Sequence, residues 1–186
     1  MIARQGIGQG TRGAIRWGLA LAVIAAAPLD AWAQAGEGFD GTYLFSGSEA
    51  ERSAHDRALE KALEKARPVT RPVVGPILRK YLCVPRSVVF RTRGDLLSIA
   101  LDPYPAREGR LDGTVSHFKN NLGQRVSLRR VVEGSTIVES VKQGKNVRLI
   151  RYDFAPGRER LTISWSVSIP AHLESPIRYS LTFTRQ

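Results

Sequence analysis

From residue 87 to the C-terminus, apolar and polar residues alternate in short segments that are separated by tight-turn residues. Turn pairs such as Glu133-Gly134 and Gln143-Gly144 mark several of the breaks. The alternation predicts strands at 87–92, 95–101, 111–118, 124–131, 135–142, 146–154, 160–169 and 177–185. Strands at this spacing, joined by short turns, are typical of an antiparallel meander.

The clearest of these strands runs from Leu161 to Ile169, where five apolar residues alternate with four hydroxyl residues. Because successive side chains of a strand point to opposite faces, one face is dry and the other is wet. Trp165 belongs to the dry face, so we expect it in the core or in the lining of a cavity.

Before the meander, the sequence changes to a helical pattern. Ser48 followed by Glu51 is a capping box, which predicts a helix over 49–67 that ends before Pro68. A stripe of small residues recurs every four positions along it: Ala50, Ala54, Ala58, Ala62 and Ala66. A second short helix is expected after Pro76, because proline suits the first helical position.

A short strand at 39–45 precedes the two helices. The expected fold class is therefore mainly β: a single antiparallel up-and-down β-barrel of about eight to ten strands, with a helix pair inserted after the first strand. Closure is expected because it removes the exposed edges of the sheet. The helical insert at 48–82 buries little apolar area through its alanines, so we expect a movable lid over the barrel mouth.

The first 33 residues have the anatomy of a secretory signal peptide. Three arginines precede an apolar run over 17–27, and Ala31-Trp32-Ala33 is a small-x-small cleavage signal. The run is much shorter than the roughly 20 residues that span a bilayer as a helix. We therefore expect no transmembrane span, cleavage after Ala33, a domain at 34–186 and export to the periplasm or the extracellular space. The alternative is an uncleaved membrane anchor.

The chain carries a formal net charge of +11, which favours anionic partners such as an envelope surface or an acidic protein. Nucleic acid is not expected as a partner, because the chain carries an export signal and no recognised binding motif. A disulfide within the chain is excluded, since Cys83 is the single cysteine. The three histidines do not have metal-ligand spacing, and no catalytic motif is present, so we expect no metal, no cofactor and no enzyme activity.

Three short segments resemble the cellular fatty-acid-binding proteins, which are relatives of the lipocalins in the calycin group. Phe39-Asp-Gly-Thr-Tyr43 is similar to their opening strand, and Gly134-Ser-Thr-Ile-Val138 is similar to a later strand start. Gly144-Lys145 followed by Arg151 resembles the strand that carries a carboxylate-binding arginine. The resemblance implies a barrel that binds a fatty acid or similar lipophilic anion. Their Arg-x-Tyr pair is not reproduced, because Arg178 and Tyr179 are adjacent and point to opposite faces.

The candidate ligand-binding residues are five in number: Arg151, Tyr179, Arg185, Trp165 and Tyr43. Arg151 faces inward in one strand register; in the other, which is more apolar and which we favour, Ile150, Tyr152 and Phe154 face inward. Arg185 either meets a ligand carboxylate or, as we favour, stacks over Tyr43 at the closed end.

Two carboxylates, Glu139 and Asp153, are further inward candidates, although an outward or turn-proximal position is favoured for both. Two functions remain open. The first is an exported binding barrel for a lipophilic anion. The second is an envelope interaction protein whose basic helices bind an anionic surface or a protein partner. An outer-membrane barrel is disfavoured by the capped polar helix.

Overall fold

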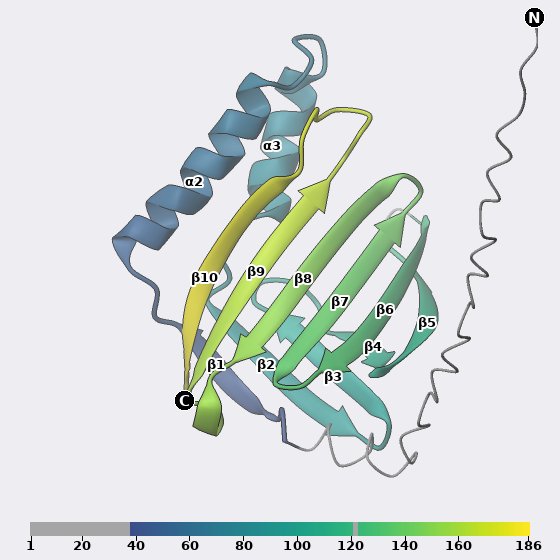
Figure 1. Ribbon diagram of the computed structural model, residues 1–186. Helices are drawn as coiled ribbons and strands as arrows, with labels where there is room; N and C mark the ends of the chain where they lie inside the picture. The colour runs from purple at the N-terminus through teal and green to yellow at the C-terminus, as the bar shows by residue number, and fades with distance from the viewer. Residues whose placement is uncertain (1–37, 121–122) are drawn as a thin grey trace, which may run out of the picture.

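The computed structural model describes residues 38–120 and 123–186 (Figure 1). The predicted signal peptide and its cleavage site lie outside the described residues, as do residues 34–37 of the predicted domain. Among the helices that are described, none is long and apolar enough to cross a membrane.

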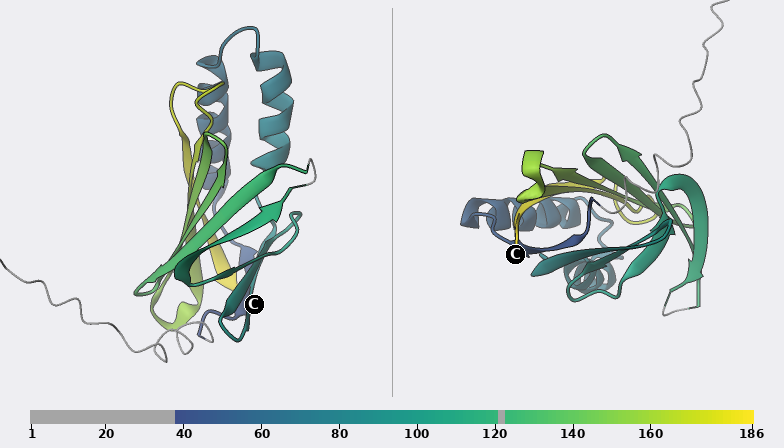
Figure 2. Two further views of the ribbon diagram at one scale, coloured as in Figure 1. Left: turned by 90° about the vertical axis from the view of Figure 1, so that its right-hand side faces the viewer. Right: turned by 90° about the horizontal axis from the view of Figure 1, so that it is seen from below.

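The described residues form one antiparallel sheet of ten strands that curls into a nearly closed barrel (Figures 1 and 2). Its order is β4-β3-β2-β1-β10-β9-β8-β7-β6-β5. The strands are β1 (Gly41–Phe45), β2 (Ser87–Arg93), β3 (Leu96–Leu101), β4 (Arg107–Arg110), β5 (Asp112–Lys119), β6 (Arg125–Glu133), β7 (Thr136–Gln143), β8 (Asn146–Phe154), β9 (Arg160–Ser168) and β10 (Ile177–Arg185). The predicted fold class is confirmed, including the position of the helices after the first strand.

The strand predicted at 111–118 is β5, displaced by one residue, whereas β4, just before it, was not predicted. Sequence alternation missed β4 because Arg107-Glu-Gly-Arg110 contains no apolar residue. It is a strand because its backbone pairs with β3. β4 and β5 are the two edges of the sheet, and they meet at a seam where the barrel lacks a backbone ladder.

Helix α2 (Glu49–Glu64) begins as predicted, with the Ser48 Oγ accepting from the Glu51 amide at 3.3 Å. It ends at Glu64, earlier than the predicted 67. The Glu51 carboxylate turns away from the cap and accepts from the backbone and hydroxyl of Thr182 at 2.8 and 2.9 Å. This pair of hydrogen bonds ties the start of α2 to β10.

Helix α3 (Arg71–Tyr81) starts before the predicted position after Pro76. Pro72 occupies the first turn, and Pro76 lies inside the helix. Pro76 removes one hydrogen bond, to the carbonyl of residue 72. The helix continues through this defect because Val74 and Leu78 are buried on one side of it. A short 3₁₀ turn, η1 (Pro156–Arg158), joins β8 to β9.

The helix pair stands at one end of the barrel and projects beyond it (Figures 1 and 2). The buried face of α2 consists of His55, Leu59, Ala62 and Leu63, whereas the predicted stripe residues Ala50 and Ala54 are exposed. The imidazole of His55 joins the two helices, since its Nε2 lies 2.5 Å from the carbonyl oxygen of Leu82.

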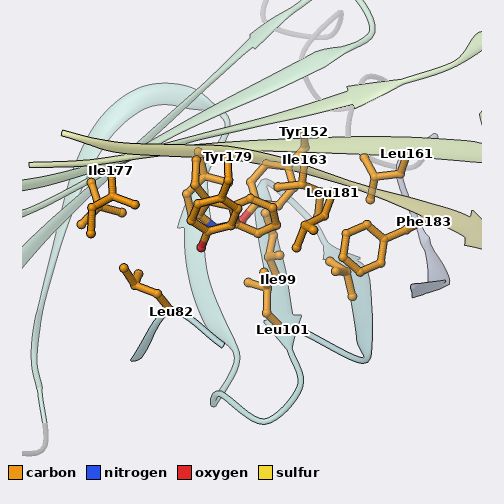
Figure 3. Packing of buried hydrophobic residues seen from close by; sticks show 14 of the residues in the cluster. Leu82, Ile99, Leu101, Tyr152, Leu161, Ile163, Ile177, Tyr179, Leu181 and Phe183 are labelled. Atoms are coloured by element: carbon orange, nitrogen blue, oxygen red, sulfur yellow. The ribbon is translucent and has the colours of Figure 1, made fainter. Parts of the chain in front are cut away.

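The interior of the barrel is mostly apolar. The inward residues of β9 include Leu161, Ile163 and Trp165, which confirms the predicted dry face. Figure 3 shows alternate residues of β10, among them Tyr179, Leu181 and Phe183, facing Leu82, Ile99 and Leu101 across the interior. Around β1 and the C-terminal end of β8, which lie away from the helices in Figure 1, aromatic rings pack on one another: Phe39, Tyr43, Phe90, Tyr152 and Phe154.

Candidate functional site: a buried arginine cluster beside a cavity

A carboxylate with two guanidinium partners lies inside the barrel. Glu139 is fully buried at the middle of β7, between the inward residues Ile137 and Val141. Its Oε1 accepts from Arg107 at 2.6 Å, and its Oε2 accepts from Arg130 at 2.7–2.8 Å. The outward position favoured for Glu139 is therefore wrong. The alternation of β7 requires the inward position, and the two arginines satisfy the buried charge.

Arg130 is itself fully buried, and its remaining hydrogen bonds close the seam. Its Nη1 donates to the carbonyl oxygen of Leu97, and its Nη2 donates to that of Arg107 at 2.9 Å. The close approach depends on Gly109 of β4: a Cβ there would lie 2.9 Å from a methyl carbon of Leu128 and 3.5 Å from Arg130 Nη1. The guanidinium of Arg130 thus joins β6 to β3 and β4.

Two further polar side chains reach the cluster from β8. Ile150 pairs with Glu139 across the strands, so Arg148 and Tyr152 lie on either side of it on the same inward face. Arg148 retains some exposure, but its Nε is enclosed, and Tyr152 is fully buried. Within the described part of the chain, neither Arg148 Nε nor Tyr152 Oη has a hydrogen-bond partner; Arg107 lies near the phenol without suitable geometry.

The charges of the cluster do not balance. Burial by itself would raise the pKa of Glu139, but Arg107 and Arg130 outweigh it and lower that pKa to about 2. Burial, followed by repulsion from Arg107, lowers the pKa of Arg148. Burial and then Glu139 raise the pKa of Tyr152, which keeps the phenol neutral. Three guanidinium groups therefore face one carboxylate, and Arg148 is the one of the three without an ion pair to it.

A narrow cavity, with room for about one water molecule between its walls, adjoins the cluster on the helix side. Its lining is mostly apolar and aromatic, with Arg107 and Arg148 as its charged members: Tyr81, Leu82, Cys83, Pro85, Leu101, Tyr104, Arg107, Arg148, Ile150, Trp165 and Tyr179. Mostly apolar walls with a few convergent polar groups are characteristic of small-molecule sites.

Two of the five candidate residues lie at this cavity. Trp165 and Tyr179 pair across β9 and β10, and their rings stack with centroids 4.9 Å apart and an interplanar angle of 18°. On the other side of Tyr179, the ring of His55 makes an edge contact at 4.7 Å. The dry face of β9 thus supplies one aromatic wall of the cavity.

Tyr43 and Arg185 lie at the aromatic end, away from the cavity. Tyr43 is buried and its hydroxyl donates to the carbonyl oxygen of Arg158 at 3.1 Å. Arg185 donates to the carbonyl oxygen of Asp40 at 2.9 Å instead of stacking over Tyr43 as expected. The guanidinium that stacks on a ring at this end is that of Arg158, 4.6 Å from the centroid of Phe39.

Arg151 lies on the outer face of β8, where it pairs with Glu133 at 3.5 Å and Asp153 at 3.4 Å. The favoured register, with Ile150, Tyr152 and Phe154 inward, is confirmed. That register also places Arg148 inward, so the sequence contained a signal for the internal cation. Arg130 had a comparable signal, since it alternates with the inward Val126 and Leu128 of β6, whereas Arg107 lies on β4, which has no apolar residue to set its register.

The lowered pKa of Glu139 predicts a loss of stability in acid. A carboxyl group whose pKa is depressed by folding contributes fully above its unfolded value of about 4.5, and this contribution disappears as the pH falls toward about 2. Urea unfolding from about pH 6 to about pH 2 should therefore show the gap in unfolding free energy between wild type and Glu139→Gln closing. A gap that stays constant over this range would contradict the prediction. Asp112→Asn is the control. Hydrogen bonds from Thr114 also lower the pKa of that carboxyl, but it is exposed, so the unfolding free energy of this variant should stay close to that of wild type over the whole pH range.

Comparison with known proteins shows the fold. No protein-family model and no curated sequence matches the chain. Lipid binding protein 8 from Caenorhabditis elegans matches with a TM-score of 0.53 at 10% identity, over 81% of this chain and 96% of that one. An abundant heat soluble (SAHS) protein from Ramazzottius varieornatus matches with a TM-score of 0.51 at 12% identity, over 80% of this chain and 95% of that one. The fatty acid transporter REP1-NXSQ matches with a TM-score of 0.50 at 11% identity, over 81% of this chain and 97% of that one.

The barrel therefore has the fold of these solved structures, the calycin fold. Within that class, its ten strands and inserted helix pair have the arrangement of the fatty-acid-binding proteins, as the sequence resemblance implied.

Proposed function

We propose that this protein is a non-catalytic barrel that binds a lipophilic anion in the cavity beside Arg148. The observation that carries the proposal is a guanidinium with an enclosed, unpartnered Nε that borders an apolar cavity. An enclosed guanidinium N–H without a partner is costly, whereas a charge-assisted hydrogen bond to a carboxylate offsets that cost. An anionic ligand would provide that partner, and its apolar part would contact the remaining walls.

The similar structures give secondary support. One is described as a fatty acid transporter and another as a lipid binding protein. Within the described residues, no group of histidine, cysteine and acidic side chains is suited to hold a metal ion. We assign the buried Glu139 to charge compensation and not to catalysis, because both of its oxygens are already bound by arginines.

The proposed location is the periplasm or the extracellular space, on the basis of the leader alone. N-terminal sequencing of the protein recovered from its native compartment should give Gln34 as the first residue. A start several residues away would show that the cleavage site is different, and an intact leader would support the membrane-anchor alternative.

Native mass spectrometry tests the binding function. The full chain is incubated with a mixture of lipophilic carboxylates from short to long, together with their methyl esters. Retention of carboxylates in preference to esters is expected, because only the charged forms can pair with Arg148. Retention of neither, or of both equally, would refute a cavity for lipophilic anions.

Two variants of the same strand make the matched comparison. Arg148→Met should abolish carboxylate retention, whereas Arg151→Met, three residues further along β8 but on the outer face, should leave it unchanged. Equal losses in both variants would indicate that general surface charge attracts the ligand.

The helix pair is expected to be the mobile entrance to this cavity. α2 and α3 contribute few large buried side chains, and their mutual ion pair, Arg79 with Glu60 at 2.9 Å, is exposed. Hydrogen exchange should show residues 49–82 less protected than strands β8 and β9, with protection rising when carboxylate is added. High protection that does not respond to carboxylate would mean that the helices form a fixed cap.

A second function, binding of an anionic lipid surface, is favoured by one observation on α3. Four apolar side chains spaced four residues apart are exposed along the helix and the turn before it. They are Val69, Val73, Ile77 and Tyr81, whose exposed fractions are 90%, 65%, 48% and 52%. Between Glu64 and Asp95 the chain contains eight basic residues and no acidic one. An apolar stripe beside basic residues suits the interface of an anionic bilayer.

Vesicle sedimentation distinguishes the two functions. Vesicles of phosphatidylcholine with phosphatidylglycerol should bind the protein at low salt and release it at high salt, while carboxylate binding in the cavity should be insensitive to salt. Val73→Ser should weaken vesicle binding and Val115→Ser, an exposed valine on β5, should not. Equal binding to vesicles of phosphatidylcholine alone would show that the negative charge of the lipid does not contribute to binding, and would refute a preference for an anionic surface.

A further inference from the structure

Two enclosed N–H groups without a partner belong to the walls of the narrow cavity. Arg107 and Arg148 are the charged residues of its lining, and the Nε of each is buried without a hydrogen-bond partner among the described residues. The hydroxyl of Tyr152, on the same inward face of β8 as Arg148, is a third enclosed donor of this kind. Each of these groups carries a desolvation cost that a bound acceptor would offset.

The only carboxylate beside these donors is already engaged. Glu139 accepts from Arg107 through Oε1 and from Arg130 through Oε2. Counting Arg148, three positive charges face one negative charge, which leaves an excess of two. A partner for the unpaired N–H groups should therefore accept hydrogen bonds and carry negative charge.

The size of the cavity limits what this partner can be. There is room for about one water molecule between the walls, and Tyr81 and Leu82 at the end of α3 belong to those walls. A carboxylate with an apolar tail enters only if the helix pair moves, whereas a single ion fits with the helices in place. Chloride is only slightly larger than water and accepts hydrogen bonds without donating any. A water molecule would need acceptors for its own hydrogen atoms and would leave the excess charge uncompensated.

We infer that the cavity is a binding site for one small monovalent anion, of the size of chloride, held by the Nε–H groups of Arg107 and Arg148. Charge-assisted hydrogen bonds of this kind are about twice as strong as neutral ones. The inference goes beyond the proposed function and does not depend on it, because the ion would bind whether or not a lipophilic carboxylate can displace it.

Thermal unfolding of the full chain tests the inference. Sodium chloride replaces sodium gluconate at constant ionic strength, since gluconate is a sugar acid much larger than the cavity. The unfolding midpoint should rise along a one-site binding curve, by about 3–6 °C at a chloride concentration ten times the fitted dissociation constant. Arg148→Met should lose this rise, and Arg151→Met, on the outer face of β8, should keep it. A midpoint that ignores chloride, or a rise that persists in Arg148→Met, would overturn the inference.

Crystals of the full chain grown in sodium bromide would locate the ion. Bromide is close to chloride in size and gives an anomalous signal. A peak is expected within hydrogen-bond distance of the Nε atoms of Arg107 and Arg148. Peaks at exposed arginines alone would indicate an adventitious ion only and would also overturn the inference.

The outcomes for the ion site and for the proposed function are separate. Chloride and a ligand carboxylate would compete for the same N–H groups, so the ionic strength in the vesicle comparison is raised with sodium gluconate. A chloride-dependent midpoint without carboxylate retention would support the ion site and refute the lipophilic-anion barrel. Carboxylate retention without any response to chloride would overturn the ion site and leave the barrel supported.

Discussion

Replacing Glu139 with glutamine is expected to destabilise the protein by about 3–5 kcal/mol, the range for breaking a buried ion pair from one side. The substitution keeps the shape of the side chain but removes the negative charge between Arg107 and Arg130. Three guanidinium groups would then share the interior without any carboxylate. The free energy of unfolding in urea at neutral pH measures the effect.

Glu133→Gln is the control for this experiment. Glu133 also pairs with an arginine, Arg151 at 3.5 Å, but both side chains are exposed. Its loss should change the unfolding free energy by less than about 1 kcal/mol, as for other surface pairs. If the two variants were equally stable, Glu139 would not be the charge that holds the arginines together.

Replacing Arg148 with methionine is expected to stabilise the unliganded protein by about 1–3 kcal/mol while it removes carboxylate binding. Methionine fills a similar volume without a charge, and exchange of buried ionic groups for apolar ones is often favourable. The gain is expected because Arg148 has an enclosed Nε without a partner and is repelled by Arg107. Thermal or urea unfolding without ligand measures it.

Arg151→Met provides the comparison on the outer face of β8 and should change stability little. A gain in stability at position 148 together with a loss of binding is characteristic of a functional site maintained at a cost to stability. A destabilised Arg148→Met protein would instead show that Arg148 makes a contact that stabilises the folded protein.

The regular parts of the fold were predictable because they depend on local patterns. The two-residue period of Leu161–Ile169 predicted both the strand and the inward position of Trp165, and Ser48 predicted the start of α2. Local patterns failed where tertiary packing decides the outcome. β4 is a strand through its pairing with β3, and α3 continues through Pro76 because its residues Val74 and Leu78 are buried.

The candidate site was harder to predict because its charged residues are buried, whereas charged residues are usually exposed to solvent. Arg130 and Glu139 are each fully buried, and their contact across β6 and β7, together with the Arg107 partner of Glu139, makes that burial tolerable. No spacing in the sequence records such a contact. Arg148 differs, because once the strand register is set by Ile150, Tyr152 and Phe154, its inward direction follows.

The seam between β4 and β5 has a consequence for how the sequence can change over generations. Arg130 serves both Glu139 in the interior and the carbonyl oxygens of Leu97 and Arg107 along the seam. Loss of Arg130 leaves a carboxylate short of a partner and two carbonyl oxygens without their donor, while loss of Glu139 leaves cations uncompensated. Homologous chains are therefore expected to keep or abandon the pair together, and a chain that abandons it should close the same gap by other means, such as backbone pairing between longer edge strands.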